Sequence, residues 1–433
     1  MQHHDVVIVG GGQAGLAMSY CLKERGIDHV ALEKQRIGHA WRNQRWDSFC
    51  LVTPNWQCRL PGFPYRGNDP EGFMVRDDIV KYIESYARNF QLPVREGVSV
   101  QRVRQEGITQ FHIATSIGDY TAKQVVIATG GYHRPKIPSM AVRLPNEVLQ
   151  LHSSEYKNSQ ALPEGAVLVV GTGQSGCQIA EDLHLAGRQV HLCVGGAPRS
   201  PRRYRGRDVV DWLEQMGYYD IPIYEHPQKE KVRHKTNHYV TGRDGGREID
   251  LRHFAREGMR LYGRLTSIQN TQLEFDDTLK VNLDQADKVA ESIKRTIDTF
   301  IEKQGLDVPP AVPYEPVWEP NEVVRELDLR AANITAVVWC IGYHTDFSWI
   351  DVPVFDGKGY PGHDRGVTPV PGLYFLGLPW LYTWGSGRFS GIGRDAQYLA
   401  DRIVVAQHRN QASLSLLERS PLLEVINEMA LGS

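Results

Sequence analysis

Cysteine is scarce in this sequence, and the cysteines present do not form a metal-binding or redox-active motif. The chain has 433 residues and six cysteines, which are scattered without a CxxC or CxxxxC spacing. The nearest pair, Cys50 and Cys58, lies further apart than those motifs allow. This pattern argues against a disulfide framework, a zinc ribbon and a redox-active dithiol, and it favours a reducing cytoplasm.

Excess charge and long apolar runs are also missing. With 49 basic and 51 acidic residues the formal charge is -2, which gives no general attraction to nucleic acid or to an anionic membrane. No apolar run approaches the roughly 18 residues of a membrane-spanning helix. The residues before Asp5 lack a charged flank followed by an apolar segment. We therefore expect neither export nor membrane insertion, and no nucleic-acid partner.

Two glycine-rich turns of the form GxGxxG are the most informative pattern present. They occupy residues 10–15 and 171–176, each after an apolar strand and at the start of a helix. Glycine permits the tight bend and lets the backbone approach a pyrophosphate, whose charge the helix N-terminus stabilises. We expect one dinucleotide in each turn, bound by Gly10, Gly12, Gln13, Ala14 and Gly15 in the first and by Gly171, Gly173, Gln174, Ser175 and Gly176 in the second.

The strands and helices around these turns predict an α/β protein with two Rossmann-like dinucleotide-binding domains. A strand at 336–341 resumes the pattern late in the chain, so we expect the second domain to be inserted into the first. The first domain is assigned to residues 1–145 and 331–433. The second is assigned to residues 146–330, with an extended insertion at about 204–330.

The two units differ at the end of the strand that follows each helix. Rossmann folds place a carboxylate there, about 20 residues beyond the turn, to bind the adenosine ribose. Glu33 stands at that point in the first unit, and Val194 stands there in the second. Because a carboxylate would repel a 2′-phosphate, its absence permits NADPH in the second turn. Arg199 and Arg202 are the first choices for the phosphate, and a solvated basic loop is the alternative.

Three further segments resemble class B flavin-dependent monooxygenases. Residues 128–138 match ATGxxxxPxxP, residues 38–42 resemble the GGxW segment that covers the flavin, and residues 341–347 resemble GYxxDF. They occur in the order found in that family. The resemblance is strongest to bacterial flavin-containing monooxygenases and to the plant-auxin type.

A fourth segment carries half of a family fingerprint. Residues 152–156 look like the HSxxY end of FxGxxxHxxxY, whose Phe and Gly positions hold Asn146 and Val148 here. His152 in this segment is interpreted as a domain-linking residue, since a lone histidine is more often a structural hydrogen-bonding group.

The resemblance implies FAD in the first turn and NADPH in the second, with NADH left open as an alternative donor. A hydride would pass to the flavin, and a C4a-(hydro)peroxide formed with O2 would deliver one oxygen atom to a small molecule. Because this chemistry belongs to the cofactor, neither a catalytic triad nor a metal site is expected. The cofactor-binding set is completed by Glu33, Trp41, Arg42, Val100, Ala128, Thr129, Gly130, Gly342, Asp346, Gly391 and Ile392.

Two loops supply the remaining site candidates. Asn55 falls near an asparagine that hydrogen-bonds the oxygenated flavin in flavin-containing monooxygenases, and Gln57 is the second choice; a simple Pro-Asn turn is the alternative. Trp380, Tyr382 and Trp384 precede a helix that begins near Gly391. These aromatic residues either wall a substrate pocket or seal a core or oligomer contact, so a homodimer is left open.

A second class of function shares both turns. A flavin-dependent quinone or disulfide reductase would bind the same two dinucleotides without oxygenating a substrate. The disulfide type needs paired cysteines near the flavin, and Cys50 and Cys58 are the only near pair. Thiol titration before and after reduction separates these alternatives.

Overall fold

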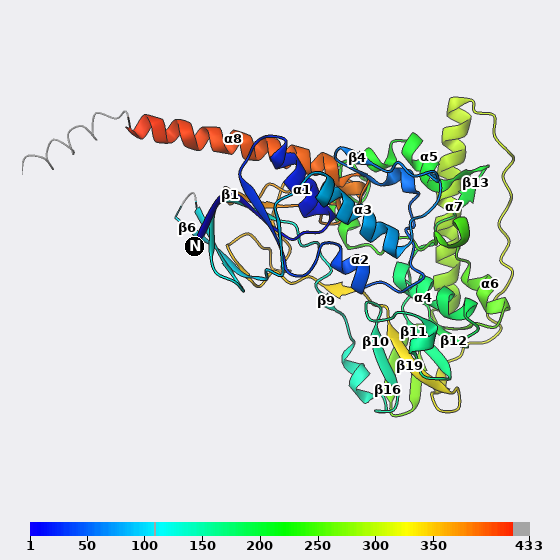
Figure 1. The fold of residues 1–433 in the computed structure, drawn as a ribbon. Helices are drawn as coiled ribbons and strands as arrows, with labels where there is room; N and C mark the ends of the chain where they lie inside the picture. The colour runs from blue at the N-terminus through cyan, green and yellow to red at the C-terminus, as the bar shows by residue number, and fades with distance from the viewer. Residues whose placement is uncertain (108–109, 419–433) are drawn as a thin grey trace, which may run out of the picture.

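Two separate sheets organise the chain, and the computed structural model describes residues 1–107 and 110–418 of it (Figure 1). The first sheet has the strand order β21-β6-β7-β8-β1-β2-β5, and β22 also pairs with β8. Its strands are β1 (Gln2–Val9), β2 (His29–Glu33), β5 (Val94–Glu96), β6 (Val100–Glu106), β7 (Gln110–Thr115), β8 (Tyr120–Ile127), β21 (Ile350–Asp351) and β22 (Leu373–Phe375).

The centre of the first sheet is parallel because each of its strands is followed by a crossover rather than a tight hairpin. β1 pairs in parallel with both β2 and β8, and its last four residues are buried. Strands that are buried on both faces in this way read as continuous apolar runs. Helix α1 (Gln13–Lys23) contacts the long C-terminal helix α8 (Ile392–Glu418), and α3 (Arg76–Asn89) lies nearby (Figure 1).

The second sheet is parallel throughout, with the order β10-β19-β11-β12-β15. Helix α4 (Gln174–Leu185) connects β11 to β12. The strands are β10 (Leu149–His152), β11 (Ala166–Val170), β12 (Val190–Cys193), β15 (Arg260–Tyr262) and β19 (Ile334–Trp339).

The position of β19 corrects the expected return to the first domain at residue 331. β19 pairs with β10 and β11, so it belongs to the second sheet. Local pattern marks an apolar strand but not its partner, because parallel pairing joins distant segments. The chain returns to the first sheet after β19, through β21 and β22. The assignment to residue 433 extends beyond the described residues.

The segment between β12 and β19 contributes β15 to the second sheet, and its long helix α7 (Leu279–Gln304) stands at the right of the molecule in Figure 1. This helix is the longest element of the segment. Shorter helices are α5 (Val209–Gln215) and α6 (Leu251–Arg256). The strands β16 (Leu265–Gln269), β17 (Gln272–Phe275) and β18 (Glu326–Asp328) form a small antiparallel sheet.

Short strand pairs and one short helix complete the described structure. Helix α2 covers His39–Asn43. The pairs are β3 (Arg59–Leu60) with β4 (Phe63–Pro64), β13 (Arg203–Tyr204) with β14 (Arg207–Asp208), and β9 (Arg134–Pro135) with β20 (Tyr343–His344). The β9–β20 pair lies where the chain crosses between the two sheets (Figure 1).

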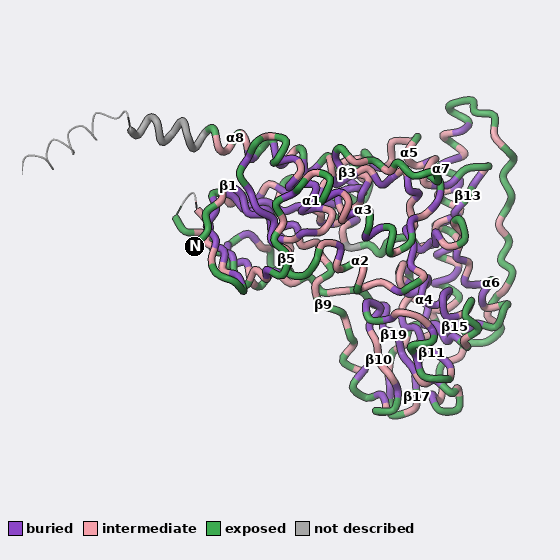
Figure 2. Tube along the Cα trace, viewed as in Figure 1, coloured by how far each residue is buried: buried purple, intermediate pink, exposed green. Residues whose placement is uncertain are grey.

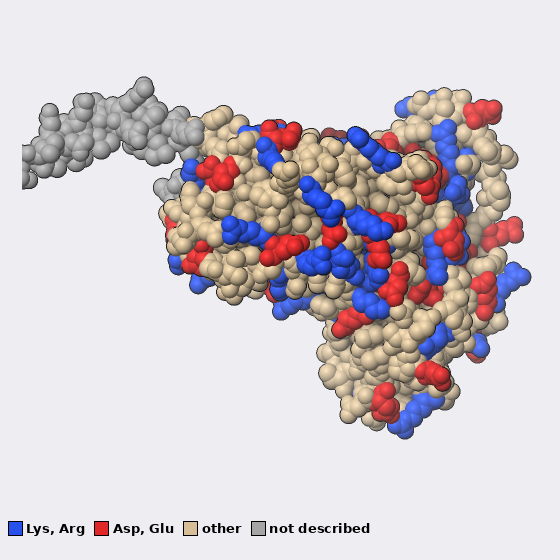
Figure 3. Space-filling view, in the orientation of Figure 1, with Lys and Arg blue, Asp and Glu red and all other residues tan. Residues whose placement is uncertain are grey.

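Burial and charge follow this arrangement. The buried residues concentrate on the strands of both sheets and on the faces of the helices that cover them (Figure 2). Lysine and arginine alternate with aspartate and glutamate over the face shown in Figure 3, without a large area of one sign. Among the helices within residues 1–107 and 110–418, we find none that is both long and apolar enough to cross a membrane.

Candidate active site

The first glycine-rich turn packs tightly against the protein backbone at Gly10 and Gly15 and has free space beside Gly12. A Cβ on Gly15 would lie 1.8 Å from the carbonyl oxygen of Gly10. Gly10 itself has φ +109°, and a Cβ there would lie 2.7 Å from the carbonyl oxygen of Ala128. A Cβ on Gly12 would meet nothing within 4 Å. The turn therefore requires glycine for packing at two positions and leaves free space at the third.

The second turn repeats this construction around different neighbours. Gly171 has φ +103°, and a Cβ there would lie 2.8 Å from the carbonyl oxygen of Cys340. A Cβ on Gly176 would lie 1.9 Å from the carbonyl oxygen of Gly171. Cys340 follows β19 as Ala128 follows β8, so β19 occupies the equivalent place in the second sheet. The two turns are structural counterparts.

A helix begins directly after the third residue of each turn: α1 follows Gly12 and α4 follows Gly173. Neither α1 nor α4 has a capping side chain or an acidic residue in its first turn. The first N–H groups of a helix have no partner within the helix, and together with the helix dipole they favour an anion. Gly12 and Gly173 are the N-cap residues, and both have extended backbone rather than left-handed conformations. This arrangement fits the pyrophosphate of a dinucleotide.

Glu33 lies at the end of β2 and faces the first turn. Its Oε2 accepts a hydrogen bond from the N–H of Gly11 at 2.7 Å, and its Oε1 accepts one from the N–H of Gln35 at 2.9 Å. The backbone carbonyl of Glu33 also accepts from the N–H of Val98 at 2.9 Å, which brings the start of β6, and so Val100, beside it. Its carboxylate is thus held at the place where Rossmann folds bind the ribose.

Trp41 joins the first turn to the loop before α8. Its Nε1 donates to Oε1 of Gln13 at 3.1 Å, and Nε2 of Gln13 donates to the carbonyl of Gly387 at 3.0 Å. The indole stacks on Phe389 with ring centres 5.7 Å apart. These bonds bring the segment that carries Gly391 and Ile392 to the helix start. Arg42 points elsewhere, since its guanidinium pairs with Glu84 of α3 at 2.6 Å.

Gln57 is a buried amide without a partner. It is 1% exposed, and neither its oxygen nor its nitrogen has a hydrogen bond to any described residue. Leaving a buried polar group unpaired costs about 1–3 kcal/mol, so such groups are rare. The neighbouring Arg59 donates from Nε to the carbonyl of Ser390 at 3.1 Å, which places this segment beside the start of α8. Thr129, two residues after the end of β8, adds another buried unpartnered oxygen, Oγ1.

The side-chain amide of Asn55 is hydrogen-bonded to the backbone of its own loop. Its Nδ2 donates to the carbonyl of Asp69 at 2.9 Å, and its Oδ1 accepts from the N–H of Met74 at 2.6 Å. Residues 55–57 form one turn of 3-10 helix. Because both halves of the amide are bonded to backbone, the structure corrects the preference for Asn55 over Gln57, and Asn55 holds the loop.

Arg199 does not face the second turn. It is 1% exposed, forms ion pairs with Glu248 and with Asp287, the latter at 2.9 Å, and stacks on Tyr314 at 4.2 Å. Arg252 joins the same cluster by pairing with Asp287, also at 2.9 Å. Two carboxylates thus neutralise the Arg199 charge. Its expected role as a phosphate ligand is corrected to a structural one that fastens α7.

Arg202 is buried in the same way. Its Nη1 donates to the carbonyl of Val52 at 2.8 Å, its Nη2 pairs with Asp208 at 2.6 Å, and its guanidinium lies over Phe73 at 4.7 Å. A phosphate would have to displace Asp208. Arg202 therefore joins the 50s loop to the insertion, and this expectation is corrected too.

Arg264 is the cation that does approach the second turn. Its Nη2 lies 3.3 Å from the point that a Cβ would occupy on Gly196, just beyond Val194 at the end of β12. This is the counterpart of the Glu33 position. Arg264 is exposed, and its nearby charge adds to the hydrogen bonds from Thr278 in lowering the pKa of Asp276. No sequence signal marks it, because it follows β15, far from the glycine-rich turn.

The remaining second-turn candidates lie around the helix start. Gln174 donates from Nε2 to the carbonyl of Val240 at 2.5 Å, and Ser175 is half-buried. Gly342 has φ +87°, and its carbonyl accepts from Nε2 of His152 at 3.1 Å. His152 ends β10, so this bond ties the second sheet to the crossing segment. The domain-linking interpretation of His152 agrees with this contact.

Asp346 stabilises a turn. Its Oδ1 accepts from both the N–H and the hydroxyl of Ser348, at 3.1 and 2.7 Å, and it pairs with Arg134 at 3.2 Å. The Ser348 hydrogen bonds, together with the nearby Arg134 and His133 charges, lower the pKa of Asp346. The carboxylate is already satisfied, so the Asx-turn alternative describes its contacts.

The three loop aromatic residues have different neighbours. Trp380 is buried with Ile223 and Val232 of the insertion. Tyr382 lies over Arg365 at 4.0 Å. Trp384 packs on Tyr219 with ring centres 4.3 Å apart. Trp380 and Trp384 therefore both seal contacts between this loop and the insertion, and Trp384 lies three residues before Gly387, which accepts the hydrogen bond from Gln13.

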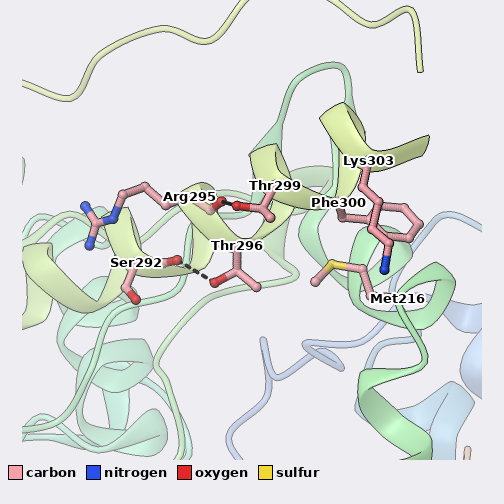
Figure 4. A pocket seen from close by; sticks show the side chains of 7 residues that line it. All are labelled: Met216, Ser292, Arg295, Thr296, Thr299, Phe300 and Lys303. Carbon is pink, nitrogen blue, oxygen red and sulfur yellow. Dashed lines mark hydrogen bonds between the residues drawn. The ribbon is translucent and has the colours of Figure 1, made fainter. Parts of the chain in front are cut away.

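A separate cavity of about 430 Å³ lies on α7, away from both turns (Figure 4). In Figure 4 the hydroxyls of Thr296 and Thr299 bond back to their own helix, at 2.9 and 3.0 Å. The polar groups do not converge on one point, which an active site requires. The lining residues are Met216, Ser292, Arg295, Thr296, Thr299, Phe300 and Lys303.

Comparison with known families decides the class of protein. Residues 7–291 match the family model described as pyridine nucleotide-disulphide oxidoreductase. The match covers most of the chain and includes both glycine-rich turns. The chain belongs to this family. It is thus an oxidoreductase, and family membership confirms the expected cofactor classes, a flavin dinucleotide with a nicotinamide dinucleotide.

Relatives within and around the family agree with this class. An uncharacterized oxidoreductase CzcO-like protein of Geobacillus kaustophilus is 35% identical over 409 residues, covering 93% of this chain and 99% of its own. The probable indole-3-pyruvate monooxygenase YUCCA1 of Arabidopsis thaliana is 32% identical over 195 residues, which is 44% of this chain and 47% of the plant protein. The recognised resemblance to flavin monooxygenases is confirmed.

Solved structures show the same fold. Two structures of a flavin monooxygenase from Stenotrophomonas maltophilia superimpose with TM-scores of 0.65 and 0.63 at 20% identity, covering 94% of this chain and 99% of theirs. A bacillithiol disulfide reductase from Bacillus cereus has a TM-score of 0.60 at 18% identity, covering 94% and 100%. These likenesses confirm the expected α/β class with two Rossmann-like units.

The family name includes disulphide reductases, but the cysteines of this member are unsuited to that reaction. All six are free and buried. Burial raises the pKa of Cys50 to about 11 and that of Cys58 to about 12. A thiol that stays protonated is a poor nucleophile. The cysteines of the chain therefore offer no pair suited to disulfide reduction.

Proposed function

We propose that the protein is an FAD-dependent, NADPH-consuming monooxygenase that transfers one oxygen atom of O2 to a small molecule. The observation that carries this proposal is the unpartnered buried amide of Gln57, on the loop that Arg59 bonds to the segment before α8, in a chain whose six cysteines are all free and buried. The flavin would supply the redox chemistry, taking a hydride from the nicotinamide and activating O2 as a C4a-(hydro)peroxide.

The first turn fits FAD on three counts. The free space at Gly12 and the uncapped start of α1 suit a pyrophosphate. Glu33 suits the ribose hydroxyls, because a carboxylate accepts both hydrogen bonds. Gln57 and Thr129 offer buried polar atoms that a flavin ring, with its carbonyls and ring nitrogens, would satisfy.

Each of these residues has a defined task in this proposal. Gln57 would orient the flavin ring and donate or accept one hydrogen bond at its polar edge. Trp41, fixed by Gln13, would shield one side of the ring from water. The positive end of the α8 dipole, at Ile392, would stabilise negative charge on the reduced ring. Excluding water in this way protects the reactive form.

The second turn fits the nicotinamide dinucleotide, and Arg264 supports NADPH over NADH. A guanidinium at the end of β12 matches a 2′-phosphate, whereas Glu33 at the equivalent end of β2 would repel one. Gly195 and Gly196 keep this edge free of side chains that would block the approach. The assignment of each dinucleotide to its turn follows from these two residues.

We assign the domains accordingly, with one change to the boundaries. FAD would be bound by residues 1–145 together with the chain that follows β19. The nicotinamide dinucleotide would be bound by residues from 146 through β19, including the insertion. The free thiols suit a reducing cytoplasm. A small-molecule substrate and O2 are the expected partners.

The experiment begins with the purified holoenzyme. We expect one FAD per chain, full reduction by NADPH under anaerobic conditions, and a slower or weaker reaction with NADH. The number of thiols titrated in denaturant should be the same before and after reduction. Two additional thiols after reduction would identify a disulfide reductase and contradict the proposal.

A further inference from the structure

A small cavity lies where the two proposed domains meet. Side chains from three segments line it: residues 46–50 of the first domain, helix α4 of the second, and residues 241–243 of the insertion. We infer that this interdomain cavity binds one water molecule through Gln178 and Glu181 of α4, and that the water keeps the nicotinamide side aligned with the flavin side for hydride transfer. The inference rests on the proposed function only for the position of each dinucleotide.

The interdomain cavity has the size of a water site. The centre of a water molecule can lie within a volume of about 10 Å³ there. A buried water needs about that much space and two to four polar partners. Sites for small molecules usually exceed about 300 Å³, so the cavity excludes a substrate or a cofactor. Three of its other lining residues, Trp46, Cys50 and Thr241, are 3%, 5% and 1% exposed, which seals it from the surface.

Two buried oxygen atoms that line the cavity lack a hydrogen-bond donor. Gln178 is 4% exposed and Glu181 is 1% exposed, and Oε1 of each forms no hydrogen bond with any described residue. The hydroxyl of Thr241 bonds to the Glu181 carboxylate and still leaves its Oε1 unpartnered. The two residues are one turn apart on α4, so they share a face of the helix. A water molecule has two O–H groups, one for each of these acceptors.

The charged neighbours do not take the place of the water. Nη2 of Arg247 lies 3.2 Å from Oε1 of Glu181, but the two atoms do not have the geometry of a hydrogen bond. Arg247 also pairs with Asp244 at 3.0 Å, and Arg243 pairs with Asp182 at 2.7 Å. Guanidinium groups beside the cavity repel a cation and the Glu181 carboxylate repels an anion. The charges therefore favour a neutral ligand.

The cavity lies on the connection between the two proposed dinucleotide sites. Helix α4 begins at the second turn, where Nε2 of Gln174 donates to the carbonyl of Val240 at 2.5 Å. A Cβ on Gly242 would lie 2.0 Å from the carbonyl oxygen of Leu51, so the insertion also touches the backbone of the first domain. Leu51 leads into the turn that carries Gln57. The water would thus bridge the helix of the nicotinamide site and the segment that leads to the flavin site.

Asp182, the next residue of α4, joins the same segments without water. Its Oδ1 accepts from the hydroxyl of Ser48 and pairs with Arg243 at 2.7 Å, and its Oδ2 accepts from the hydroxyl of Tyr156 at 2.6 Å. The domains are therefore held by one direct contact and one hydrated contact on neighbouring positions. Misplacing reacting groups by about 1 Å can cost roughly a hundredfold in rate. Loss of the water should slow hydride transfer more than it weakens dinucleotide binding.

The kinetic test is anaerobic reduction of the holoenzyme by NADPH in a stopped-flow spectrometer. In Gln178→Leu we expect the rate constant at saturating NADPH to fall at least about tenfold and the dissociation constant to change less than about threefold. Glu181→Leu should behave alike, whereas Glu181→Gln, which keeps an oxygen for the water, should retain most of the rate. The control is His184→Gln, on the same helix but paired with Glu257 outside the cavity, and it should change neither quantity.

A crystal structure of the holoenzyme tests the water itself. We expect an ordered water within hydrogen-bond distance of Oε1 of both Gln178 and Glu181 in the wild type, and none in Gln178→Leu. A dry cavity, or a direct hydrogen bond between the two side chains, would overturn the inference even if the variants failed to fold. So would a Gln178→Leu variant that is reduced at the wild-type rate. No O2 is used, so a failure of oxygen transfer would contradict the proposed function alone.

Discussion

Nη2 of Arg264 lies 3.3 Å from the place that a Cβ would take on Gly196, so the guanidinium covers the end of β12 at the point where Glu33 covers the end of β2. One fold therefore presents opposite charges at equivalent positions. In the proposed function these two charges would select between adenosine riboses, the carboxylate for free hydroxyls and the guanidinium for a phosphate.

The first prediction concerns this guanidinium. Arg264→Gln should weaken NADPH binding by roughly tenfold to a hundredfold, because a hydrogen bond to a charged group is worth about 1.5–3 kcal/mol. NADH binding should not change. Binding of 2′,5′-ADP and 5′-AMP, measured by calorimetry, checks this without turnover. Arg325→Gln, which alters an exposed arginine paired with Asp277, is the control. Equal losses for both dinucleotides would contradict the assignment.

The second prediction separates the two turns. Gly12 and Gly173 have φ of -77° and -64°, so alanine fits their backbone. A Cβ at Gly12 meets nothing within 4 Å, and one at Gly173 comes no closer than 3.6 Å to Thr236. Gly12→Ala should fold and lose FAD, whereas Gly173→Ala should keep FAD and bind NADPH roughly tenfold or more weakly.

Absorbance of the purified variants and NADPH titration provide the readout. Gly15→Ala is the contrast, because its Cβ would lie 1.8 Å from a backbone oxygen and should prevent folding of the turn. Loss of FAD from Gly173→Ala with FAD retained in Gly12→Ala would reverse the assignment of the dinucleotides.

The third prediction concerns Gln57. Gln57→Leu removes an unpaired buried amide, so the apoprotein should become more stable by about 1–3 kcal/mol. The same change should weaken FAD binding, roughly tenfold, because the ring loses a hydrogen bond. Denaturant unfolding of apoprotein and fluorescence titration with FAD measure the two effects. If Gln57 had only a structural role, apoprotein stability would fall and FAD affinity would be unaffected.

The fourth prediction follows from the correction of Arg199. Arg199→Gln leaves Glu248 without its buried guanidinium partner and Asp287 with Arg252 alone, and it should lower the free energy of unfolding by about 3–5 kcal/mol. NADPH affinity at low temperature should be unchanged. Arg203→Gln, at an exposed neighbouring position, should alter neither quantity. A stable Arg199→Gln variant with weak NADPH binding would restore its role as a phosphate ligand.

The parts of the site that could be predicted from sequence are those fixed by local spacing. Gly10, Gly15 and Glu33 belong to one βαβ unit, whose short connections determine where each residue lies. The second glycine-rich turn could be predicted for the same reason. The carboxylate of Glu33 is bonded to the turn that it was expected to accompany.

The parts that could not be predicted depend on contacts between distant segments. A run of arginines after residue 198 indicates basic character, but only the folded chain brings Glu248 and Asp287 to Arg199. Arg264 reaches the second turn through the pairing of β12 with β15. The strand β19 was recognised, while its sheet was not, because parallel partners are remote in sequence.

The choice between Asn55 and Gln57 shows the same limit at short range. Both are amides in one turn of 3-10 helix. The side chain of Asn55 is hydrogen-bonded to backbone groups in the folded chain, and that of Gln57 is not. Sequence places both near the flavin segment, and it carries no information on which amide is left without a partner.

The most direct test of the account is to reduce the holoenzyme with NADPH without oxygen and to mix it with O2 in a stopped-flow spectrometer. We predict a transient flavin absorbance, distinct from the oxidised and reduced spectra, that decays with transfer of one atom from isotopically labelled O2 into an added substrate. Direct return to the oxidised spectrum without such an intermediate, with hydrogen peroxide as the only product, would contradict a monooxygenase.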